Sequence, residues 1–267
     1  MSTRKISSTE YQKFQELIYN EIGITLNETK MSLIESRFYK RMLYHNTECF
    51  EEYYNICMAD SSEKTQMLDI ITTNETYFFR EEEHFRFLKE YVQEYGMESK
   101  LRIWSAASSV GVEAYSIAMV CDNILPPNKW EIIGTDINTD VIKKARMRLY
   151  NISWAEKIPS EFKLKYCLKG KGKFEGKFLI TKEFAKNVKF QISNLMETNS
   201  DLGVFDIVFL RNVLIYFNTQ TRQKVLKSIM GNMRIGSLLI ISQTENLNSL
   251  DLACLEQIHP SIFKRIS

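Results

Sequence analysis

The sequence of 267 residues lacks the features that most directly indicate a charged partner or a membrane. Its net charge is only +2, so no overall field favours nucleic acid or a membrane surface. No apolar run approaches the roughly 20 residues that span a bilayer, so we expect no membrane insertion. The first five residues lead into polar sequence, from which we expect no signal peptide and a cytoplasmic location.

Motifs for metals and phosphates are also missing. The five cysteines are scattered without a C-x-x-C pair, which predicts reduced thiols and no zinc site. His45, His84 and His259 have no ligand spacing, so we expect neither a metal nor a catalytic histidine. There is no G-x-G-x-x-G and no Walker lysine, so a phosphate-binding loop is not indicated.

The sequence does show a change in the spacing of its apolar residues along the chain. Residues 1–70 show helical spacing, with one helix ended by Gly23 and others expected at about 28–44, 51–58 and 63–71. After that, strands expected at 101–104, 130–136, 205–210 and 237–241 alternate with helices at 112–121, 140–149 and 219–233. A helical domain followed by an α/β domain with a doubly wound, mostly parallel sheet is therefore predicted. Residues 262–266 are expected to add a terminal edge strand.

The expected domain boundaries follow from the same pattern. The helical domain takes 1–70, a linker takes 71–90 and the sheet domain takes 91–267. Within the sheet domain, residues 155–190 interrupt the alternation with glycines among lysines. We expect a small inserted β-subdomain there.

Residues Thr72–Arg80, TTNETYFFR, place polar groups beside aromatic side chains. Such a mixture suits a site for a small, charged, partly aromatic ligand, and Arg80 offers a fork for a carboxylate. The alternative is a helix start capped by Thr73 or Asn74 with the aromatics turned inward.

Asp136 ends the second expected strand, after a loop of small residues at 105–111. An acidic residue at this place commonly holds ribose hydroxyls, and the alternative is a helix cap. A ribose acceptor without a phosphate loop indicates an adenosyl ligand without pyrophosphate. S-adenosylmethionine, with S-adenosylhomocysteine as product, fits this description.

Several ordered motifs then resemble one family. They are residues 72–80, 102–106, 134–139 and 205–217, with weaker matches at 193–195 and 244–247. Over nearly its whole length the chain resembles the chemotaxis-receptor glutamate O-methyltransferases, the CheR family. The resemblance implies a Rossmann-like S-adenosylmethionine-dependent methyltransferase domain behind the helical domain. It also implies methylation of glutamate carboxylates on the cytoplasmic helical region of chemoreceptors.

The family pattern assigns roles to individual residues. Arg80 and Tyr216 should lie beside the transferred methyl group. A reactant glutamate has a reference pKa of about 4.3 and is already ionised near neutral pH, so no general base is required. Arg211 is expected to be a structural ion-pair partner. The residues implied in cofactor binding are Asn74, Thr76, Arg80, Glu113, Asp136, Asn194, Leu195, Asn212 and Val213.

Two surfaces are implied to meet the receptor. A basic stretch with Arg37, Lys40 and Arg41 should meet the acidic substrate helix, although a solvated face or a nucleic-acid site are alternatives. The β-subdomain should dock a receptor C-terminal tail, and its alternative is a solvated decoration.

The loop before Glu113 departs from the family pattern. Val110, Val112 and Ala114 stand where the family usually has threonine, glutamate and proline, while Glu113 is retained. We expect an active enzyme. The alternatives are a non-catalytic member that binds the cofactor or a signalling partner, and a methyltransferase for a small molecule.

Overall fold

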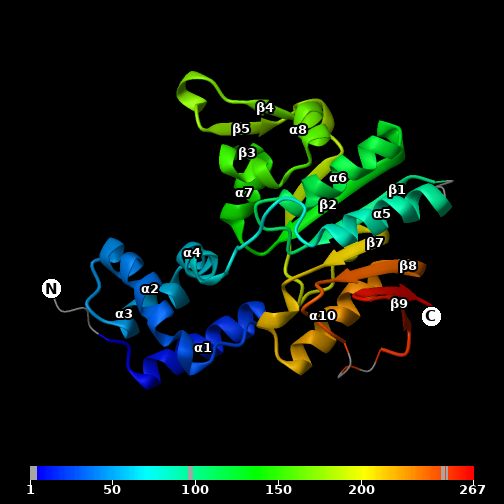
Figure 1. Ribbon diagram of the computed structural model, residues 1–267. Helices are drawn as coiled ribbons and strands as arrows, with labels where there is room; N and C mark the ends of the chain where they lie inside the picture. The colour runs from blue at the N-terminus through cyan, green and yellow to red at the C-terminus, as the bar shows by residue number, and fades with distance from the viewer. Residues whose placement is uncertain (1–4, 96–98, 248–249, 251) are drawn as a thin grey trace. The chain divides into compact units, whose positions relative to one another are not determined.

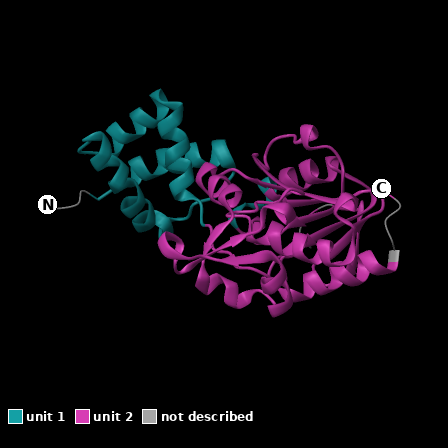
Figure 2. Ribbon diagram, turned by 90° about the horizontal axis from the view of Figure 1, so that it is seen from above, with its two compact units in different colours: residues 1–73, 216–221 teal, residues 74–215, 222–267 magenta. Residues whose placement is uncertain are grey.

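The computed structural model describes residues 5–95, 99–247, 250 and 252–267. The chain divides into two compact units, residues 1–73 with 216–221 and residues 74–215 with 222–267 (Figure 2). Residues 1–4, on which the expectation about a signal peptide rests, lie outside the described part. No described helix has the length and apolar content that a membrane crossing requires.

The first unit is helical, as predicted. Its helices are α1 (Ser8–Ile22), η1 (Glu28–Lys30), α2 (Met31–His45), α3 (Phe50–Ala59) and α4 (Ser61–Ile71). Helix α1 begins in a capping box, where Ser7 and Glu10 bond each other's backbone N–H groups, and it ends at Gly23 with φ 73°. The Phe14 and Phe38 rings lie 4.7 Å apart in the core of the unit.

From Asn74 onward the chain builds two sheets with covering helices (Figure 1). The helices are α5 (Glu82–Tyr95), α6 (Val112–Ile124), η2 (Pro127–Lys129), α7 (Thr139–Met147), η3 (Ile152–Lys157), α8 (Ser160–Tyr166), η4 (Gly172–Phe174), α9 (Lys182–Ala185), η5 (Ser200–Leu202), η6 (Leu214–Tyr216) and α10 (Thr219–Gly231). The strands are β1 (Leu101–Ala106), β2 (Trp130–Asp136), β3 (Leu149–Asn151), β4 (Cys167–Lys169), β5 (Lys177–Ile180), β6 (Val188–Ile192), β7 (Phe205–Leu210), β8 (Met233–Ile241), β9 (Leu255–His259) and β10 (Ile262–Arg265).

The large sheet has the strand order β6-β2-β1-β7-β8-β10-β9, in which β6, β2, β1, β7 and β8 are parallel. This confirms the predicted mostly parallel sheet. Its central strands are almost wholly buried, as their continuous apolar runs require.

The expected edge strand at 262–266 was wrong in its position. Strand β10 lies between β8 and β9 and pairs antiparallel with both. The strand at this edge of the sheet is β9, which we did not anticipate. Four of its five residues are exposed, so its sequence carries no buried alternating face that would have identified it.

The small sheet, β3-β5-β4, lies near the top of Figure 1, away from β8 and β9. Its first strand arises where a helix was expected to run on to residue 149. Helix α7 stops at Met147 because Arg148 adopts φ 60°, and Leu149 then begins β3. At the other end of the insertion, Val188–Ile192 pairs with β2 in the large sheet.

Candidate active site

The carboxyl ends of five parallel strands lie level with one another. Across the sheet, Ile192 pairs with Asp136, Ala106 with Thr135 and Leu210, and Leu210 with Ile241. The chain order reverses on either side of β1, and open α/β sheets bind ligands at such an edge. The residues that follow these strand ends are therefore candidates for one site.

Asp136 points its carboxylate into the neighbouring loop. Its Oδ2 accepts a hydrogen bond from the Ser109 N–H at 2.8 Å, and its Oδ1 accepts one from the Asn138 N–H at 2.9 Å. The N-cap of α7 is Asn138, whose Oδ1 accepts from Asp140 N at 2.9 Å. The helix-cap interpretation of Asp136 was therefore wrong, and the carboxylate instead ties β2 to the loop after β1.

That loop has a tightly constrained backbone. Ala107 and Ser109 have φ of 59° and 51°, a left-handed conformation that non-glycine residues rarely adopt. Gly134 beside it leaves room for the Phe190 ring, because a Cβ at Gly134 would lie 2.6 Å from that ring. Ser108 Oγ is buried and finds no hydrogen-bond partner in the described part of the chain, which leaves a polar group for a ligand.

The three departures from the family pattern are apolar packing positions. Val112 and Ala114 are fully buried in the core around β1 and α6, and Val110 packs against the same core. Gly111, at φ 85°, is the N-cap of α6 and makes no side-chain cap bond. At Val110 and Val112, apolar contacts thus occupy the places where the family pattern has polar side chains.

Glu113, in the first turn of α6, meets Arg211 at the end of β7. Its Oε2 lies 2.8 Å from Arg211 Nη1, and its Oε1 accepts from Ser105 Oγ at 2.7 Å. The Arg211 side chain is 1% exposed. The expectation that Arg211 is an ion-pair partner is confirmed.

Residues 72–80 do not begin a helix, so that alternative was wrong. Helix α4 ends at Ile71 and α5 starts only at Glu82, which leaves an extended segment and a turn between them. Phe78 and Phe79 are buried, whereas Tyr77 is 44% exposed. Asn74 and Thr76 are half-buried, and Ser109 Oγ donates to the Asn74 carbonyl at 3.5 Å.

The backbone of Arg80 is held by a hydrogen bond, whereas its guanidinium group has no carboxylate partner among the described residues. Its carbonyl accepts a hydrogen bond from Arg211, which anchors the turn to β7. Its guanidinium donates to the Glu75 carbonyl at 3.1 Å and lies 5.8 Å from the Tyr77 ring. In the described part of the chain, no carboxylate pairs with it.

Sequence reasoning missed Glu81, the residue next to Arg80. Glu81 has φ 58°, and its carboxylate accepts from Ser242 Oγ at 2.8 Å and from the Gln243 N–H at 3.0 Å. Arg211 Nη2 is 3.4 Å away. Burial raises the pKa of Glu81, but the bonds from Gln243 and Ser242 and the charge of Arg211 outweigh it and lower the pKa. The acidic run that follows Arg80 was the available signal.

Asn212 and Val213 follow the end of β7, as expected. Asn212 has φ 58°, donates its N–H to Glu245 at 3.0 Å and donates its side-chain amide to Ser242 Oγ at 2.8 Å. Val213 is half-buried. Burial raises the pKa of Glu245, which sequence reasoning also left out.

Asn194 and Leu195 lie just beyond β6. Asn194 Oδ1 accepts from the Met196 N–H at 3.0 Å, which holds the turn, and Leu195 is 8% exposed. Together with Asp136, they place one amide, one carboxylate and one apolar side chain near neighbouring strand ends.

Four of the anticipated residues belong to the helical unit. Tyr216 accepts a backbone bond from Thr25 at 3.0 Å, and Arg37 donates to the carbonyls of Ile70 and Ile71 at 2.8 and 2.7 Å. Arg41 makes a two-pronged ion pair with Glu63, whereas Lys40 is exposed. The roles of all four in catalysis and substrate binding stay predictions.

The donor set at the strand ends fits an adenosyl ligand with an amino-acid end. Asp136 supplies a carboxylate where ribose hydroxyls bind in such sheets, and Glu113 supplies one suited to an ammonium group. The buried Ser108 hydroxyl has a hydrogen bond to offer. The unpaired guanidinium of Arg80 adds one positive group for an anionic reactant.

Comparison with known proteins agrees with this geometry. Residues 74–258 match the family model for the S-adenosylmethionine-binding domain of CheR methyltransferase, and residues 9–72 match its all-alpha domain. A chemotaxis protein methyltransferase of Salmonella typhimurium is 32% identical over 92% of this chain and 86% of its own length. Chemotaxis protein methyltransferase 2 of Pseudomonas aeruginosa is 34% identical over 89% of this chain and 86% of its own. A chemotaxis protein methyltransferase of Borreliella burgdorferi is 32% identical over 97% of this chain and 95% of its own length.

Proposed function

The chain belongs to the CheR methyltransferase family, and from this membership we propose that it esterifies glutamate side chains of chemotaxis receptors in the cytoplasm. The relatives that share most of its length are named chemotaxis protein methyltransferases. The observation that carries the proposal is the arrangement at the strand ends. Glu113 and Asp136 offer carboxylates there, while Arg211 fixes the backbone of an unpaired Arg80.

The residues of the chain divide the work between binding and positioning. S-adenosylmethionine, when bound, supplies a methyl group on a sulfonium that a carboxylate oxygen can attack. Asp136 would hold the ribose hydroxyls and Glu113 the ammonium group. Asn74, Thr76, Asn194, Leu195, Asn212 and Val213 would complete the cofactor contacts.

Arg80 would hold the oxygen of the substrate glutamate that does not attack. A guanidinium binds a carboxylate in a defined plane, so it restricts the orientation of the nucleophile. Proximity and orientation supply on the order of 7 kcal/mol or more in reactions between two held groups. Because the substrate glutamate is ionised near neutral pH, the site needs no general base. Tyr216 would orient the same carboxylate.

The remaining assignments rest on the family. Residues 71–90 would serve as the linker that carries Arg80, between a helical domain at 1–70 and a methyltransferase domain at 91–267. Lys40, with Arg37 and Arg41, would face the acidic helix of the receptor. The insertion at 155–190 would dock a receptor tail.

The test is transfer of a radiolabelled methyl group from S-adenosylmethionine to receptor-containing membranes. We expect label in the receptor band that mild base releases as methanol, because esters hydrolyse under conditions that leave amines and thioethers intact. Label that resists base would contradict an ester. Binding of S-adenosylhomocysteine without any transfer would favour the non-catalytic alternative, and label confined to low-molecular-weight products would favour a small-molecule methyltransferase.

A further inference from the structure

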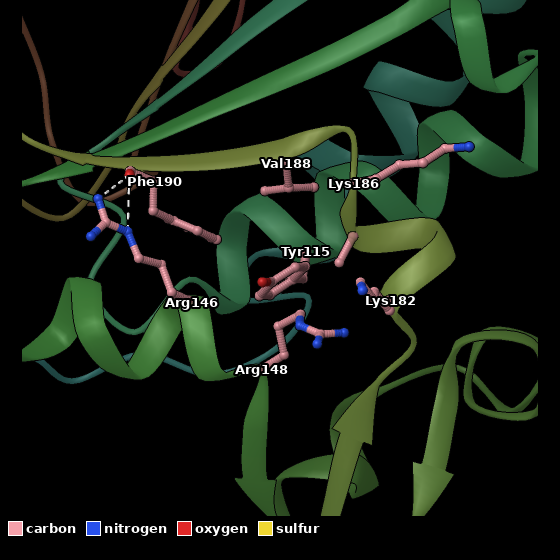
Figure 3. Close-up of a pocket in the computed structure, with 8 residues that line it drawn as sticks. Tyr115, Arg146, Arg148, Lys182, Lys186, Val188 and Phe190 are labelled. Carbon is pink, nitrogen blue, oxygen red and sulfur yellow. Dashed lines mark hydrogen bonds between the residues drawn. The ribbon is translucent and has the colours of Figure 1, made fainter.

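A pocket of about 240 Å³ opens on the methyltransferase unit between α6, α7, α9 and β6 (Figure 3). Four of its lining side chains are cationic: Arg146, Arg148, Lys182 and Lys186. No carboxylate lines it. Within the described part of the chain, none of the four cations makes an ion pair.

Some other cations of the same unit do have carboxylate partners. Elsewhere on the same unit, Lys100 and Arg102 both pair with Glu131 at 2.6 Å, and Lys165 pairs with Asp122 at 3.3 Å. Cations that line one hollow repel one another, and an anion bound among them offsets this repulsion. The arrangement therefore favours a bound anion.

The two arginines are held in place by neutral groups. Arg146 donates from Nε and Nη2 to the Phe190 carbonyl at 3.2 and 2.6 Å, and Arg148 donates to the Ile180 carbonyl at 2.8 Å (Figure 3 shows the Arg146 pair). These bonds leave the positive charges uncompensated and leave further N–H donors unused. The guanidinium groups are thus oriented before any ligand arrives, which lowers the entropy cost of binding.

The floor of the pocket is rigid. The Phe190 ring packs 5.4 Å from the Tyr115 ring, and a Cβ at Gly111 would lie 2.7 Å from it. The carbonyls at the C-terminal end of α7 would repel an anion, but Tyr115 Oη donates to the Ala145 carbonyl at 3.0 Å and occupies it. The negative end of the helix is therefore partly neutralised.

We propose that this pocket binds a small phosphorylated metabolite with at least two negative charges. Arginine and lysine together are the common donors for phosphate oxygens. The volume holds about eight water molecules, which suits a compact anion rather than an extended peptide. This proposal does not depend on the methyl-transfer function and can fail independently of it.

Calorimetric titration with inorganic pyrophosphate, at constant ionic strength in chloride, tests the proposal. Pyrophosphate is chosen because a nucleotide would also compete for the adenosyl site. We expect saturable binding of one pyrophosphate per chain. The double variant Lys182→Gln/Lys186→Gln should bind about tenfold to a hundredfold more weakly, the loss expected for charge-assisted hydrogen bonds.

The matched control is Lys171→Gln/Lys173→Gln, which removes the same charge from exposed positions of the insertion outside the pocket. It should keep the wild-type affinity, and both double variants should keep the wild-type affinity for S-adenosylhomocysteine, which verifies folding. No saturable heat in the wild type would overturn the proposal. Equal losses in the two double variants would show only a general attraction, and binding of polyglutamate without pyrophosphate would favour an acidic peptide instead.

Discussion

Each unit contains a cluster in which an arginine meets a carboxylate and one of the two is buried, and these two clusters differ in how the chain assembles them. In the helical unit, Glu63 accepts from Arg41 and from Tyr53 and contacts His45. We call this the Glu63 cluster. In the methyltransferase unit, Arg211 pairs with Glu113 and Glu81, and we call this the Arg211 cluster.

The Glu63 cluster is local. Arg41 and Glu63 are 22 residues apart, and both lie in regular helices. The Arg211 cluster joins segments 98 and 131 residues apart. Two residues in or beside it, Glu81 and Asn212, have φ of 58° each. Left-handed backbone of this kind costs about 1 kcal/mol or more per residue and gathers where geometry serves function.

Hydrogen bonding separates the clusters further. Arg41 uses Nε in its pair with Glu63, whereas Arg211 Nε is buried and has no hydrogen-bond partner among the described residues. Arg211 also donates a hydrogen bond to the Arg80 carbonyl. The cluster is thereby connected to Arg80, whose guanidinium has no carboxylate partner in the described chain. The comparison indicates that the Glu63 cluster stabilises the fold and that the Arg211 cluster positions Arg80.

The largest effect on activity should come from Arg80→Ala, because the Arg211 cluster holds the backbone of Arg80. We expect kcat to fall about a thousandfold, which corresponds to about 4 kcal/mol of activation free energy. The free energy of unfolding should change little, since the Arg80 side chain makes no ion pair in the described chain. Steady-state kinetics and urea unfolding measure the two quantities. Arg86→Ala, at an exposed position of α5, is the control; near-normal turnover of the Arg80 variant would refute the positioning role.

Glu63→Gln should act on stability instead. Burial alone raises the pKa of Glu63, but hydrogen bonds from Arg41 and Tyr53 and the contact with His45 outweigh it and lower the pKa to about 2. Relative to the ordinary value of 4.5, this contributes roughly 3 kcal/mol to the free energy of unfolding. We expect the variant to lose about that amount at pH 7 and to keep its specific activity when folded.

The pH dependence of stability gives a second measurement on Glu63. Its pKa is depressed in the folded state, so its contribution is fully present above pH 4.5 and is lost as the pH falls from 4.5 towards 2. The free energy of unfolding, measured with urea between these pH values, should therefore change less with pH in Glu63→Gln than in the wild type. The exposed Glu16→Gln is the control. An equal slope in both variants would show that Glu63 is not the titrating group.

Glu81→Gln should have the next largest effect, and on catalysis. The change removes the negative charge that accepts from Ser242 and Gln243, and charge-assisted bonds contribute about 1.5–3 kcal/mol each. We expect kcat to fall about tenfold to a hundredfold while affinity for S-adenosylhomocysteine changes less than about threefold. Glu82→Gln, at the exposed neighbouring position, should leave kcat unchanged. Similar losses in both variants would make the effect one of general charge.

The sequence predicted β2, β1 and β7 well because these central strands are almost wholly buried, whereas β6, whose residues alternate between buried and exposed, was not anticipated as a strand. Runs such as residues 205–210 have few other interpretations, whereas β9 is exposed and β3 has only three residues. Asp136 could be anticipated from its place at the end of a strand, whereas Glu113 was assigned only because the chain resembles the family.

Glu81 and Ser242 could not be anticipated in the same way. Their contact joins residues 161 apart, and no local pattern encodes it. The left-handed conformations of Phe79, Ala107 and Asn212 gave no signal either, since none of these residues is glycine. The sequence therefore predicted that the site lies at the strand ends. The hydrogen bonds that hold the backbone of Arg80 could be identified only in the three-dimensional structure.

The smallest effect is expected from the basic stretch of α2. Two of its cations, Arg37 and Arg41, make bonds within the helical unit, which limits the variants that can test it. Reversing Arg37 or Arg41 would break bonds to α4 and to Glu63, so a loss of activity could reflect unfolding. Lys40 is exposed, and Lys40→Glu leaves those bonds intact. We expect the KM for receptor to rise about threefold with kcat and S-adenosylhomocysteine affinity unchanged, since an exposed charge contributes little to a contact.

The dependence on salt and a control variant distinguish a specific contact of Lys40 with the receptor from a general electrostatic attraction. The difference in KM between Lys40→Glu and wild type should shrink as ionic strength rises, because exposed charges are screened. Lys227→Glu, at an exposed position of α10, should leave KM unchanged at every salt concentration. If Lys40→Glu and Lys227→Glu behave alike, the basic stretch of α2 is a solvated face.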